Sequence, residues 1–401
     1  MARSSPFHAL HADAAASFMT WGAPGADEKA GAPIVESFGE IGLEYAAIRR
    51  EGRGCAVFDQ PHRGTIRVRG KDRIPFLNRK LTQELKDLAP FRSRRSFWLN
   101  RRGRIDADLR IIELPDEMYF DLDVLCAAAT VATLSAFIFS EDIELADVSD
   151  SMHRIALHGP ASLRLLQQAS IFVDGTSVID LSPGRACRIT IADKAVIADR
   201  DDSTGDIGIE LLMQSADARA VWDRLFAVAA EPSPAGPLRL KPIGWHAWNI
   251  ARIEAGTPLF NIDFGPDSLP HETGVLESRV SFTKGCYLGQ EVVARMHSLG
   301  HPKQRLVALR PPLDSATSHD PEWQPSTGSA VMARNAEGAE DAKPVGAVTS
   351  STRSPMLGDS IICFAQVRYA STDPGMKLIV RAPAGDLPMT VQDTLAFWKR
   401  Q

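Results

Sequence analysis

Residues 284–291 read KGCYLGQE, and this segment marks a change in the pattern of the chain. Ahead of it, runs with the period of strands alternate with runs with the period of helices. Behind it, from Lys303 onward, short alternating runs and turn residues follow without a long helical run. The sequence therefore predicts α+β domains ahead of the segment and an all-β domain behind it.

The part behind the segment is expected to form a small antiparallel β-barrel of roughly 90 residues, because short strands recur between regular turn signals. We place the boundary near residues 300–302, which read GHP. The expected strands are Arg305–Leu309, Ala330–Ala333, Val345–Ser350, Ser360–Phe364, Lys377–Arg381 and Met389–Val391.

The part ahead of the segment contains a weak internal repeat over residues 60–230, in which a strand, a glycine turn, a helix, a hairpin and a helix occur twice. Helices are predicted over residues 40–50 and 242–255. We expect domains at residues 36–150, 151–300 and 301–401. Residues 1–35 are rich in Ala, Gly and Pro and are expected to be a loosely ordered or surface-lying extension.

The composition is that of a globular protein, with 44% apolar and 24% charged residues in 401. A net charge of −5 with interspersed signs gives no general attraction to nucleic acid or membrane. No apolar run reaches the ~18 residues of a membrane span, and the amino terminus is a poor secretory signal. The five cysteines are widely spaced, which predicts neither disulfides nor a metal site and favours the cytoplasm.

One local basic cluster stands out, in the stretch from Arg92 to Arg104. Two interpretations are open: a solvated hairpin edge, or an anion-binding rim for a polyglutamate tail or a phosphate.

Cys286 is the first candidate for chemistry, because glycines on both sides remove bulk and permit unusual backbone geometries. Lys284 and Arg295 are expected to favour its thiolate and lower its pKa. Gln290 and Glu291 would supply a donor, an acceptor and a negative charge. The alternative is a buried cysteine in a tight turn.

Two carboxylates form the second candidate. Asp106 and Asp108 lie two apart on an expected strand and therefore share one face. They could polarise an amine or hold the edge of a pterin-type ring. Equally, they could be the solvated side of an edge strand.

Glu210 closes the third candidate, the stretch TGDIGIE from Thr204. A carboxylate early in a strand after such a turn could accept two parallel hydrogen bonds from a guanidine-like N–H pair on a heterocycle. The alternative is a β-turn with an exposed glutamate. No Gly-Lys-Ser/Thr follows the glycines, which disfavours a P-loop.

The fourth candidate is the helix that carries Trp248 and Arg252, which are i, i+4 neighbours. Their side chains could stack and hold a ligand. Packing alone explains this face equally well.

Taken together in order, several segments resemble the glycine-cleavage T-protein (aminomethyltransferase) superfamily over residues 40–395. They are EYAAIRREGRGCAVFD (44–59), VRGKDRIPFL (68–77), residues 99–109, ALHGP (156–160), TGDIGIE (204–210), RIEAG (252–256) and VGAVTSSTRSPMLG (345–358). KGCYLGQE, with Pro270 and Glu272, resembles one branch of it, the YgfZ-like folate-binding proteins, which include mitochondrial iron–sulfur assembly factors.

The resemblance implies an α+β fold in a three-domain cloverleaf: two related α+β domains and a C-terminal antiparallel β-barrel around a central folate cavity. The cofactor would be tetrahydrofolate. Glu210 matches the family glutamate that reads the pterin, Arg252 matches the arginine of the RLEAG motif, and Asn100 matches the hairpin turn.

Three departures bear on the activity. Aminomethyltransferases carry two adjacent aspartates on the hairpin, and Ala107 stands at the first position, with Asp108 at the second. Trp248 replaces an arginine that helps T-proteins grip folate, and Ser203 replaces the tyrosine of the GYTGE turn. These losses argue against glycine cleavage.

The leading hypothesis is therefore a tetrahydrofolate-binding YgfZ-like protein that supports maturation or repair of iron–sulfur enzymes, with iron–sulfur client proteins as partners. Cys286 would be its functional thiol. The enzyme alternative is a folate-dependent aminomethyl- or methyltransferase, in which Asp106 or Asp108 replaces the missing aspartate. A third alternative is a binding module for another heterocycle.

Overall fold

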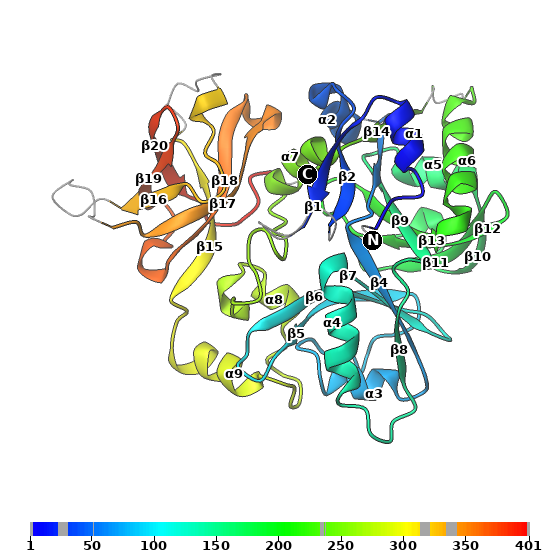
Figure 1. The fold of residues 1–401 in the computed structure, drawn as a ribbon, viewed down its shortest axis with the longest axis horizontal. Coiled ribbons are helices and arrows are strands. Elements are labelled where there is room, and N and C mark those ends of the chain that lie inside the picture. Colours follow the sequence, from blue (N-terminus) through cyan, green and yellow to red (C-terminus); the bar gives the residue numbers. More distant parts are fainter. Residues whose placement is uncertain are drawn as a thin grey trace. The chain divides into compact units, whose positions relative to one another are not determined.

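This computed structural model describes residues 3–22, 31–50, 52–232, 236, 238–312, 321–333 and 343–398 (Figure 1). The chain folds into two compact units and passes between them several times. The first unit holds residues 1–98, 107–248 and 284–287, and the second holds residues 99–106, 249–283 and 288–401.

The first unit is built on two sheets with helices (Figure 1). A seven-stranded sheet has the order β10-β11-β12-β13-β9-β3-β14, and a five-stranded sheet has the order β5-β6-β7-β4-β8. The strands are β3 (Gly54–Asp59), β4 (Arg63–Arg69), β5 (Arg92–Leu99), β6 (Ile105–Glu113), β7 (Met118–Asp123), β8 (Glu144–Asp147), β9 (Met152–His158), β10 (Ser170–Gly175), β11 (Ala186–Ile191), β12 (Lys194–Arg200), β13 (Gly208–Gln214) and β14 (Arg239–Ile243). The helices are α2 (Ile41–Arg49), α3 (Arg73–Asn78), α4 (Val124–Ser135), α5 (Ser162–Ala169), α6 (Ala218–Ala230) and the start of α7 (Trp245–Glu254).

The seven-stranded sheet has one apolar and one polar face, because side chains alternate along each strand. On the apolar face, Ile155 and Leu157 of β9 join Ile209 and Leu211 of β13 in a core with α5 and α6. The alternate residues of the two strands, including Arg154 and Glu210, occupy the other face. That face is also buried, although it is polar.

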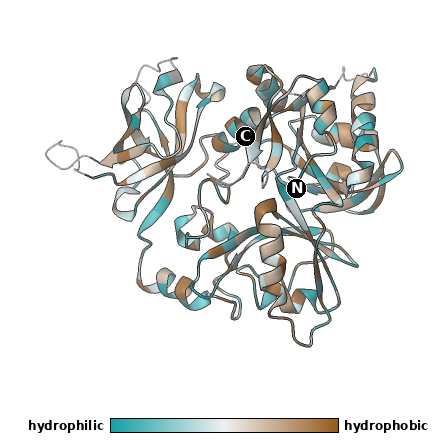
Figure 2. Cartoon of the chain, viewed as in Figure 1, coloured by the Kyte–Doolittle hydropathy of each residue, from teal (hydrophilic) through white to brown (hydrophobic). Residues whose placement is uncertain are grey.

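The five-stranded sheet is divided in the same way. Helix α4, which is coloured mainly as hydrophobic in Figure 2, packs against β4, β7 and β8. The opposite face carries the polar residues of the central strands, among them Arg63, Arg110 and Asp121. Arg110 and Asp121 stand directly opposite each other in the pairing of β6 with β7.

The described part of residues 1–35 is folded, contrary to the expectation of a loosely ordered extension. It forms α1 (His8–Asp13) and β1 (Ser17–Trp21), and β1 pairs with β2 (Ala32–Ser37). The Arg3 guanidinium donates to the carbonyl oxygens of residues 61, 63, 149 and 152. Phe7 is fully buried in the core of the seven-stranded sheet. The sequence did not predict that this segment packs on the first unit, because its contact partners are distant in the chain.

The strand β3 shows why the predicted boundary at residue 150 does not separate the two sheets. It precedes the five-stranded sheet in sequence, yet it pairs antiparallel with β9 and parallel with β14 in the other sheet. Pro242 lies within β14, which has only one neighbour in the sheet, so a missing N–H is tolerated there. The predicted helix over residues 242–255 therefore begins later, at Trp245.

The second unit contains a closed antiparallel barrel, which confirms the predicted C-terminal β domain. Its strand order is β15-β18-β17-β16-β19-β20. The bounds are β15 (Gln304–Arg310), β16 (Ala330–Ala333), β17 (Gly346–Ser354), β18 (Ser360–Arg368), β19 (Lys377–Ala382) and β20 (Gly385–Val391). The short helices α8 (Leu276–Arg279) and α9 (Gln290–Leu299) precede the barrel. Among the helices of the described ranges, none combines the length and the apolar character of a membrane span.

Candidate functional site

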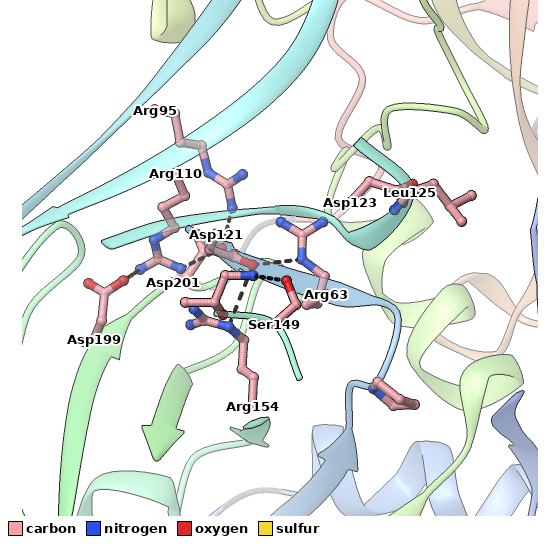
Figure 3. A network of polar contacts seen from close by, with 12 residues as sticks. Arg63, Arg95, Arg110, Asp121, Asp123, Leu125, Ser149, Arg154, Asp199 and Asp201 are labelled. Atoms are coloured by element: carbon pink, nitrogen blue, oxygen red, sulfur yellow. Dashed lines mark hydrogen bonds and ion pairs between the residues drawn. The ribbon is translucent and has the colours of Figure 1, made fainter. Parts of the chain in front are cut away.

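The polar faces of the two sheets of the first unit are joined by buried ion pairs (Figure 3). Arg110 pairs with Asp199 at 2.5 Å and with Asp201 at 2.8 Å, which links β6 to β12 and the turn after it. Asp121 on β7 accepts from Arg63 at 2.8 Å. A buried charge is costly unless it is paired and hydrogen-bonded. Removing one partner of these ion pairs would therefore destabilise the contact between the two sheets.

Arg154 and Glu210 are among the members of this buried polar layer that have atoms without a hydrogen-bond partner in the described ranges. Arg154 is 1% exposed, and its nearest acidic partner is Asp121, at 3.5 Å from its Nε. None of its three guanidinium nitrogens has a hydrogen-bond partner within the described ranges. Glu210 is 5% exposed, and its Oε2 is equally without a partner there. A buried donor group and a buried acceptor thus remain available on one face of the sheet.

The strand register brings Arg154 and Glu210 close together. Glu210 stands opposite Ala156, and Arg154 stands opposite Leu212, so the two charged residues are diagonal neighbours on adjacent strands. Diagonal neighbours of this kind lie about 7–8 Å apart, within reach of long side chains.

Burial and charge shift the pKa values in this layer in opposite directions. Burial raises the pKa of Glu210 to about 7, although the Arg154 charge lowers it. Burial would also raise the pKa of Asp121, but Arg154 and Arg63 outweigh burial and hold that pKa below its usual range. Near neutral pH, Glu210 therefore titrates, whereas Asp121 stays ionised.

A row of side chains runs from Glu210 toward an aromatic pair. Ala156 stands opposite both Glu210 on β13 and Phe58 on β3, and directly opposite residues of antiparallel strands share a face. The Phe58 ring stacks on Trp248, with centroids 5.5 Å apart and an interplanar angle of 20°. The Trp248 Nε1 is buried and lacks a hydrogen-bond partner among the described residues. The small Ala156 side chain thus lies between the Glu210 carboxylate and the Phe58–Trp248 pair.

The TGDIGIE stretch holds Glu210 in this row. Gly205 has a φ of +78°, and a Cβ on Gly208 would lie 2.2 Å from the Asp201 carbonyl oxygen, so glycine is required at both positions. The Gly208 N–H donates to Asp202 Oδ1 at 2.9 Å, which closes the turn just before β13. The structure therefore replaces the alternative of an exposed glutamate with a buried one.

Lys284 of the KGCYLGQE segment is hydrogen-bonded to backbone carbonyl oxygens. Its Nζ donates to the carbonyl oxygens of Asn78, Leu81 and Gln83 at 2.7, 2.7 and 2.8 Å. These three bonds use all three ammonium protons and tie the segment to the loop after α3. Its donors are thus directed to the backbone, and the effect on the thiolate of Cys286 that was expected of Lys284 stays a prediction.

The other residues of the segment are more accessible. Cys286 is exposed, which removes the alternative of a buried cysteine. Gln290 and Glu291 lie in the first turn of α9, half-buried and exposed respectively, and Arg295 lies on an exposed position of that helix. The ligand-binding roles expected for Gln290, Glu291 and Arg295 stay predictions.

Arg252 lies in a buried hydrogen-bond network of the second unit. It is fully buried and donates to Asn249 Oδ1 at 2.8 Å, Asp263 Oδ2 at 2.5 Å and Ser350 Oγ at 2.6 Å. A further bond goes to the carbonyl oxygen of Thr257 at 3.2 Å. These bonds join the end of α7 to β17 within the second unit. The side chain is occupied by these partners, and the folate-binding role expected for Arg252 stays a prediction.

Asn100 shapes the hairpin turn. Its Nδ2 donates to Asp106 Oδ1 at 2.9 Å, and its Oδ1 accepts from the N–H groups of Arg102 and Arg104. A Cβ on Gly289 would lie 2.8 Å from the Asn100 carbonyl oxygen, so the turn packs on the start of α9. Asn100 thus forms the turn, and the ligand contact expected for it stays a prediction.

The strand after this turn carries the two aspartates. Asp106 and Asp108 are both half-buried on β6, as alternate residues. The charges of Asp201 and Asp108 raise the pKa of Arg95 against the effect of burial, which attaches Asp108 to the buried network. Ala107, at the position of the missing carboxylate, is fully buried.

Sequence reasoning missed Arg154, Arg110 and Asp121. The available signal was one charged residue inside an otherwise apolar strand, as in MHRIALH over β9. A charged residue in such a position is either paired across the fold or available to a ligand.

Comparison with known proteins agrees with this architecture. Residues 8–284 match the family described as "GCVT N-terminal domain". The chain is 29% identical over 345 residues to an aminomethyltransferase of Geobacillus kaustophilus, covering 83% of this chain and 86% of the relative. It is 26% identical over 391 residues to an aminomethyltransferase of Anoxybacillus flavithermus, covering 95% of both.

A solved structure shares the fold. The crystal structure of glycine cleavage system aminomethyltransferase T from Bartonella henselae superposes with a TM-score of 0.80 at 21% identity, covering 100% of this chain and 99% of that one. The family match covers the two larger sheets and their helices, and the closed barrel follows it. The chain therefore belongs to the GCVT N-terminal domain family, within the T-protein superfamily.

Proposed function

We propose that this protein is a tetrahydrofolate-dependent one-carbon transferase of the T-protein type, acting on an aminomethyl or methyl group. The observation that carries the proposal is the buried Glu210 Oε2, which has no partner in the described structure and lies diagonal to the incompletely paired Arg154. The names of the relatives, aminomethyltransferases, support the same activity.

The residues fit a pterin. A pterin edge presents neighbouring N–H donors, and an ionised carboxylate can accept two parallel hydrogen bonds from them. Ala156 leaves the row beside Glu210 short, and the buried Phe58–Trp248 pair beyond it carries an N–H without a partner among the described residues. Tetrahydrofolate, when bound, supplies the nitrogen atoms that accept the one-carbon unit.

The protein's own residues then have distinct tasks. Glu210 orients the ring, and Arg154 stabilises its ionised form. Asp108 is the candidate for holding or moving a proton near the one-carbon donor, because Ala107 cannot. Because the carboxylate stands at Asp108 and not at position 107, the preferred one-carbon donor would differ from that of the aminomethyltransferases.

Binding is the first test. Equilibrium dialysis with tetrahydrofolate should show saturable binding to the wild type and at least about tenfold weaker binding to Glu210→Gln, since a hydrogen bond to a charged group contributes about 1.5–3 kcal/mol. Glu231→Gln, which alters an exposed carboxylate, is the matched control. Equal binding by wild type and Glu210→Gln would remove the assignment of Glu210.

Turnover is the second test. The protein is incubated with tetrahydrofolate and an aminomethyl or methyl donor, and methylene- or methyltetrahydrofolate is measured by mass spectrometry. Asp108→Asn should lower the rate while leaving folate binding intact. Folate binding without product formation from any donor would favour a binding protein over a transferase.

A second candidate function is the support of iron–sulfur enzymes, as in the YgfZ-like branch. It rests on Cys286, which is exposed, whereas Cys55, Cys187 and Cys363 are buried. The names of the relatives favour the transferase, so this role takes second place. Cys286→Ala should abolish complementation of a strain that lacks such a factor, and full complementation would remove the role.

A further inference from the structure

A cavity of about 710 Å³ lies within the second unit, and the proposed function does not use it. Its walls come from β15, from the 3₁₀ helix η4 (Pro270–Glu272), from α9 and from the segment after β20. Its volume is within the range of roughly 300–1,000 Å³ that is typical of small-molecule sites.

The walls of the cavity are fixed by backbone contacts. The Gln392 N–H donates to the Ala308 carbonyl oxygen at 2.9 Å, and the N–H groups of Phe397 and Trp398 donate to the Glu254 carbonyl oxygen at 2.8 and 3.0 Å. These bonds hold the segment after β20 in place as one wall. The cavity is therefore formed before any ligand arrives, which reduces the entropy lost on binding.

His271 provides an unused pair of polar atoms in this cavity. Its 3₁₀ helix is held by the Leu269 N–H, which donates to Glu272 Oε2 at 2.8 Å. Both ring nitrogens of His271 are buried and have no hydrogen-bond partner in the described part of the chain. Burial and the neighbouring His297 lower the pKa of His271 to about 4, so the ring is neutral at pH 7. A neutral imidazole offers one donor and one acceptor.

Three ring-bearing residues besides His271 line the cavity, namely His297, His301 and Tyr369, and each is stacked on another ring. His301 stacks on Tyr369 with centroids 4.3 Å apart and an interplanar angle of 6°. His297 stacks on Phe282 at 3.8 Å and 18°. Tyr369, which lines the cavity, remains 39% exposed, so ring surface is left for a further planar group.

These features select among ligand classes. An aliphatic ligand would leave both His271 nitrogens unpaired, which costs free energy. A small anion alone would leave the neutral His271 ring without an N–H donor for its acceptor nitrogen, and among the charged lining residues it would meet the carboxylates Glu277 and Asp393 beside Arg305. A planar ring with a donor and an acceptor on its edge satisfies His271 and stacks on the exposed aromatic rings.

We propose that this cavity binds a planar heteroaromatic ring of the nucleobase class, hydrogen-bonded by His271 and stacked on the ring pairs of Tyr369 and His297. Glu277 and Asp393, which also line the cavity, are carboxylates that can accept hydrogen bonds from the hydroxyl groups of an attached sugar. Arg305, also in the lining, is the residue that would contact an attached phosphate.

The probes are adenosine and adenosine monophosphate, which share the ring and differ in the phosphate. Binding to the full-length protein is measured by equilibrium dialysis and by saturation-transfer NMR. His271→Phe keeps a flat ring and removes both nitrogens, and it should weaken binding of both probes at least about tenfold, the ratio that corresponds to one lost hydrogen bond. Tyr369→Ala, which removes a ring that is 39% exposed, should weaken both as well.

The controls separate this cavity from the proposed folate site. His246→Phe alters an exposed histidine of the other unit, and Glu210→Gln alters the pterin reader, and neither should change adenosine binding. Tighter binding of the monophosphate that is lost in Arg305→Gln supports the phosphate contact. Absence of binding by both probes at millimolar concentration overturns the proposal, as does binding that Glu210→Gln removes and His271→Phe leaves unchanged.

Discussion

At the scale of single residues, Glu210 combines two opposed demands. As a ligand-reading carboxylate it must ionise, yet its surroundings favour the protonated form because it is buried. A group whose pKa rises on folding from 4.5 to about 7 stabilises the fold at low pH, and that stabilisation is lost as the pH rises through this window. The full effect is on the order of 3 kcal/mol at about 1.4 kcal/mol per pKa unit.

The first prediction concerns this titration. Glu210→Gln should have little effect on the free energy of unfolding near pH 5, and it should stabilise the ligand-free protein at pH 8, where the wild type carries the buried charge. Denaturant unfolding at both pH values measures the difference. A Glu210→Gln variant that is equally stable relative to wild type at pH 5 and pH 8 would show that Glu210 does not titrate in this range.

The same titration sets the pH dependence of ligand binding. If the ionised carboxylate reads the pterin, the affinity of the wild type for tetrahydrofolate should rise between pH 6 and pH 8 and then level off. Glu210→Gln should bind weakly with no such rise. Equilibrium dialysis across this range, with Glu231→Gln as control, distinguishes an ionised reader from a protonated one.

A second residue with a measurable property is Cys286. Burial raises the pKa of the Cys55, Cys187 and Cys363 thiols to about 12, whereas Cys286 is exposed. A thiol reagent should therefore modify Cys286 first in the folded protein, as peptide mapping by mass spectrometry would show. Cys286→Ser should remove the fast phase of the reaction, and an unchanged fast phase would place the reactive thiol elsewhere.

At the scale of elements, the KGCYLGQE segment depends on Lys284. Its three bonds to backbone carbonyl oxygens fix the chain at the point where it crosses back into the first unit. Lys284→Met keeps much of the side-chain length and leaves three carbonyl oxygens without their donor. We expect a loss of roughly 2–5 kcal/mol in the free energy of unfolding. Lys194→Met, on a half-exposed ion pair, should change stability by less than about 1 kcal/mol.

The amino-terminal segment is also an integral element. Phe7 packs against Trp222 with ring centroids 4.8 Å apart, and Asp59 accepts from Ser5 Oγ at 2.5 Å. Phe7→Ala should therefore destabilise the protein by roughly 3–5 kcal/mol, as expected for a buried phenylalanine. Phe139→Ala, at an 87% exposed side chain, should have little effect in the same unfolding experiment.

At the scale of the whole molecule, two units with separate cores should unfold in separable steps. Phe7 belongs to the core of the first unit, and Arg252 holds α7 to β17 in the second. In calorimetry, Phe7→Ala should lower one transition and Arg252→Ala the other. A single transition that both variants lower equally would show that the units unfold as one cooperative body.

Much of the architecture could be predicted because it depends on local patterns. Period-two alternation in residues 305–391 predicted the barrel, and alternating strand and helix patterns predicted the α+β class. These patterns depend only on the spacing of apolar and polar residues that are close together in the chain. Boundaries were less predictable: β3 joins the sheet of the later segment because its partner, β9, lies about a hundred residues away.

The roles of charged residues could not be predicted in the same way. Lys284 and Arg252 looked like site residues in the sequence, and both are occupied by backbone or side-chain partners in the structure. Arg154 lies in an apolar run without a recognisable motif, yet all three of its guanidinium nitrogens are buried without a hydrogen-bond partner in the described ranges. Whether a charge is paired depends on contacts between segments far apart in sequence, which local patterns do not contain.

For this protein, the sequence by itself determined the succession of strands and helices, the place of the KGCYLGQE segment between two kinds of fold, and the carboxylate at Glu210. The tertiary structure alone decided that Glu210 is buried opposite Ala156, that Lys284 binds the backbone, and that Cys286 is exposed. The reason is physical: local periodicity sets the direction of a side chain, whereas its burial and its partners are set by the segments that pack against it.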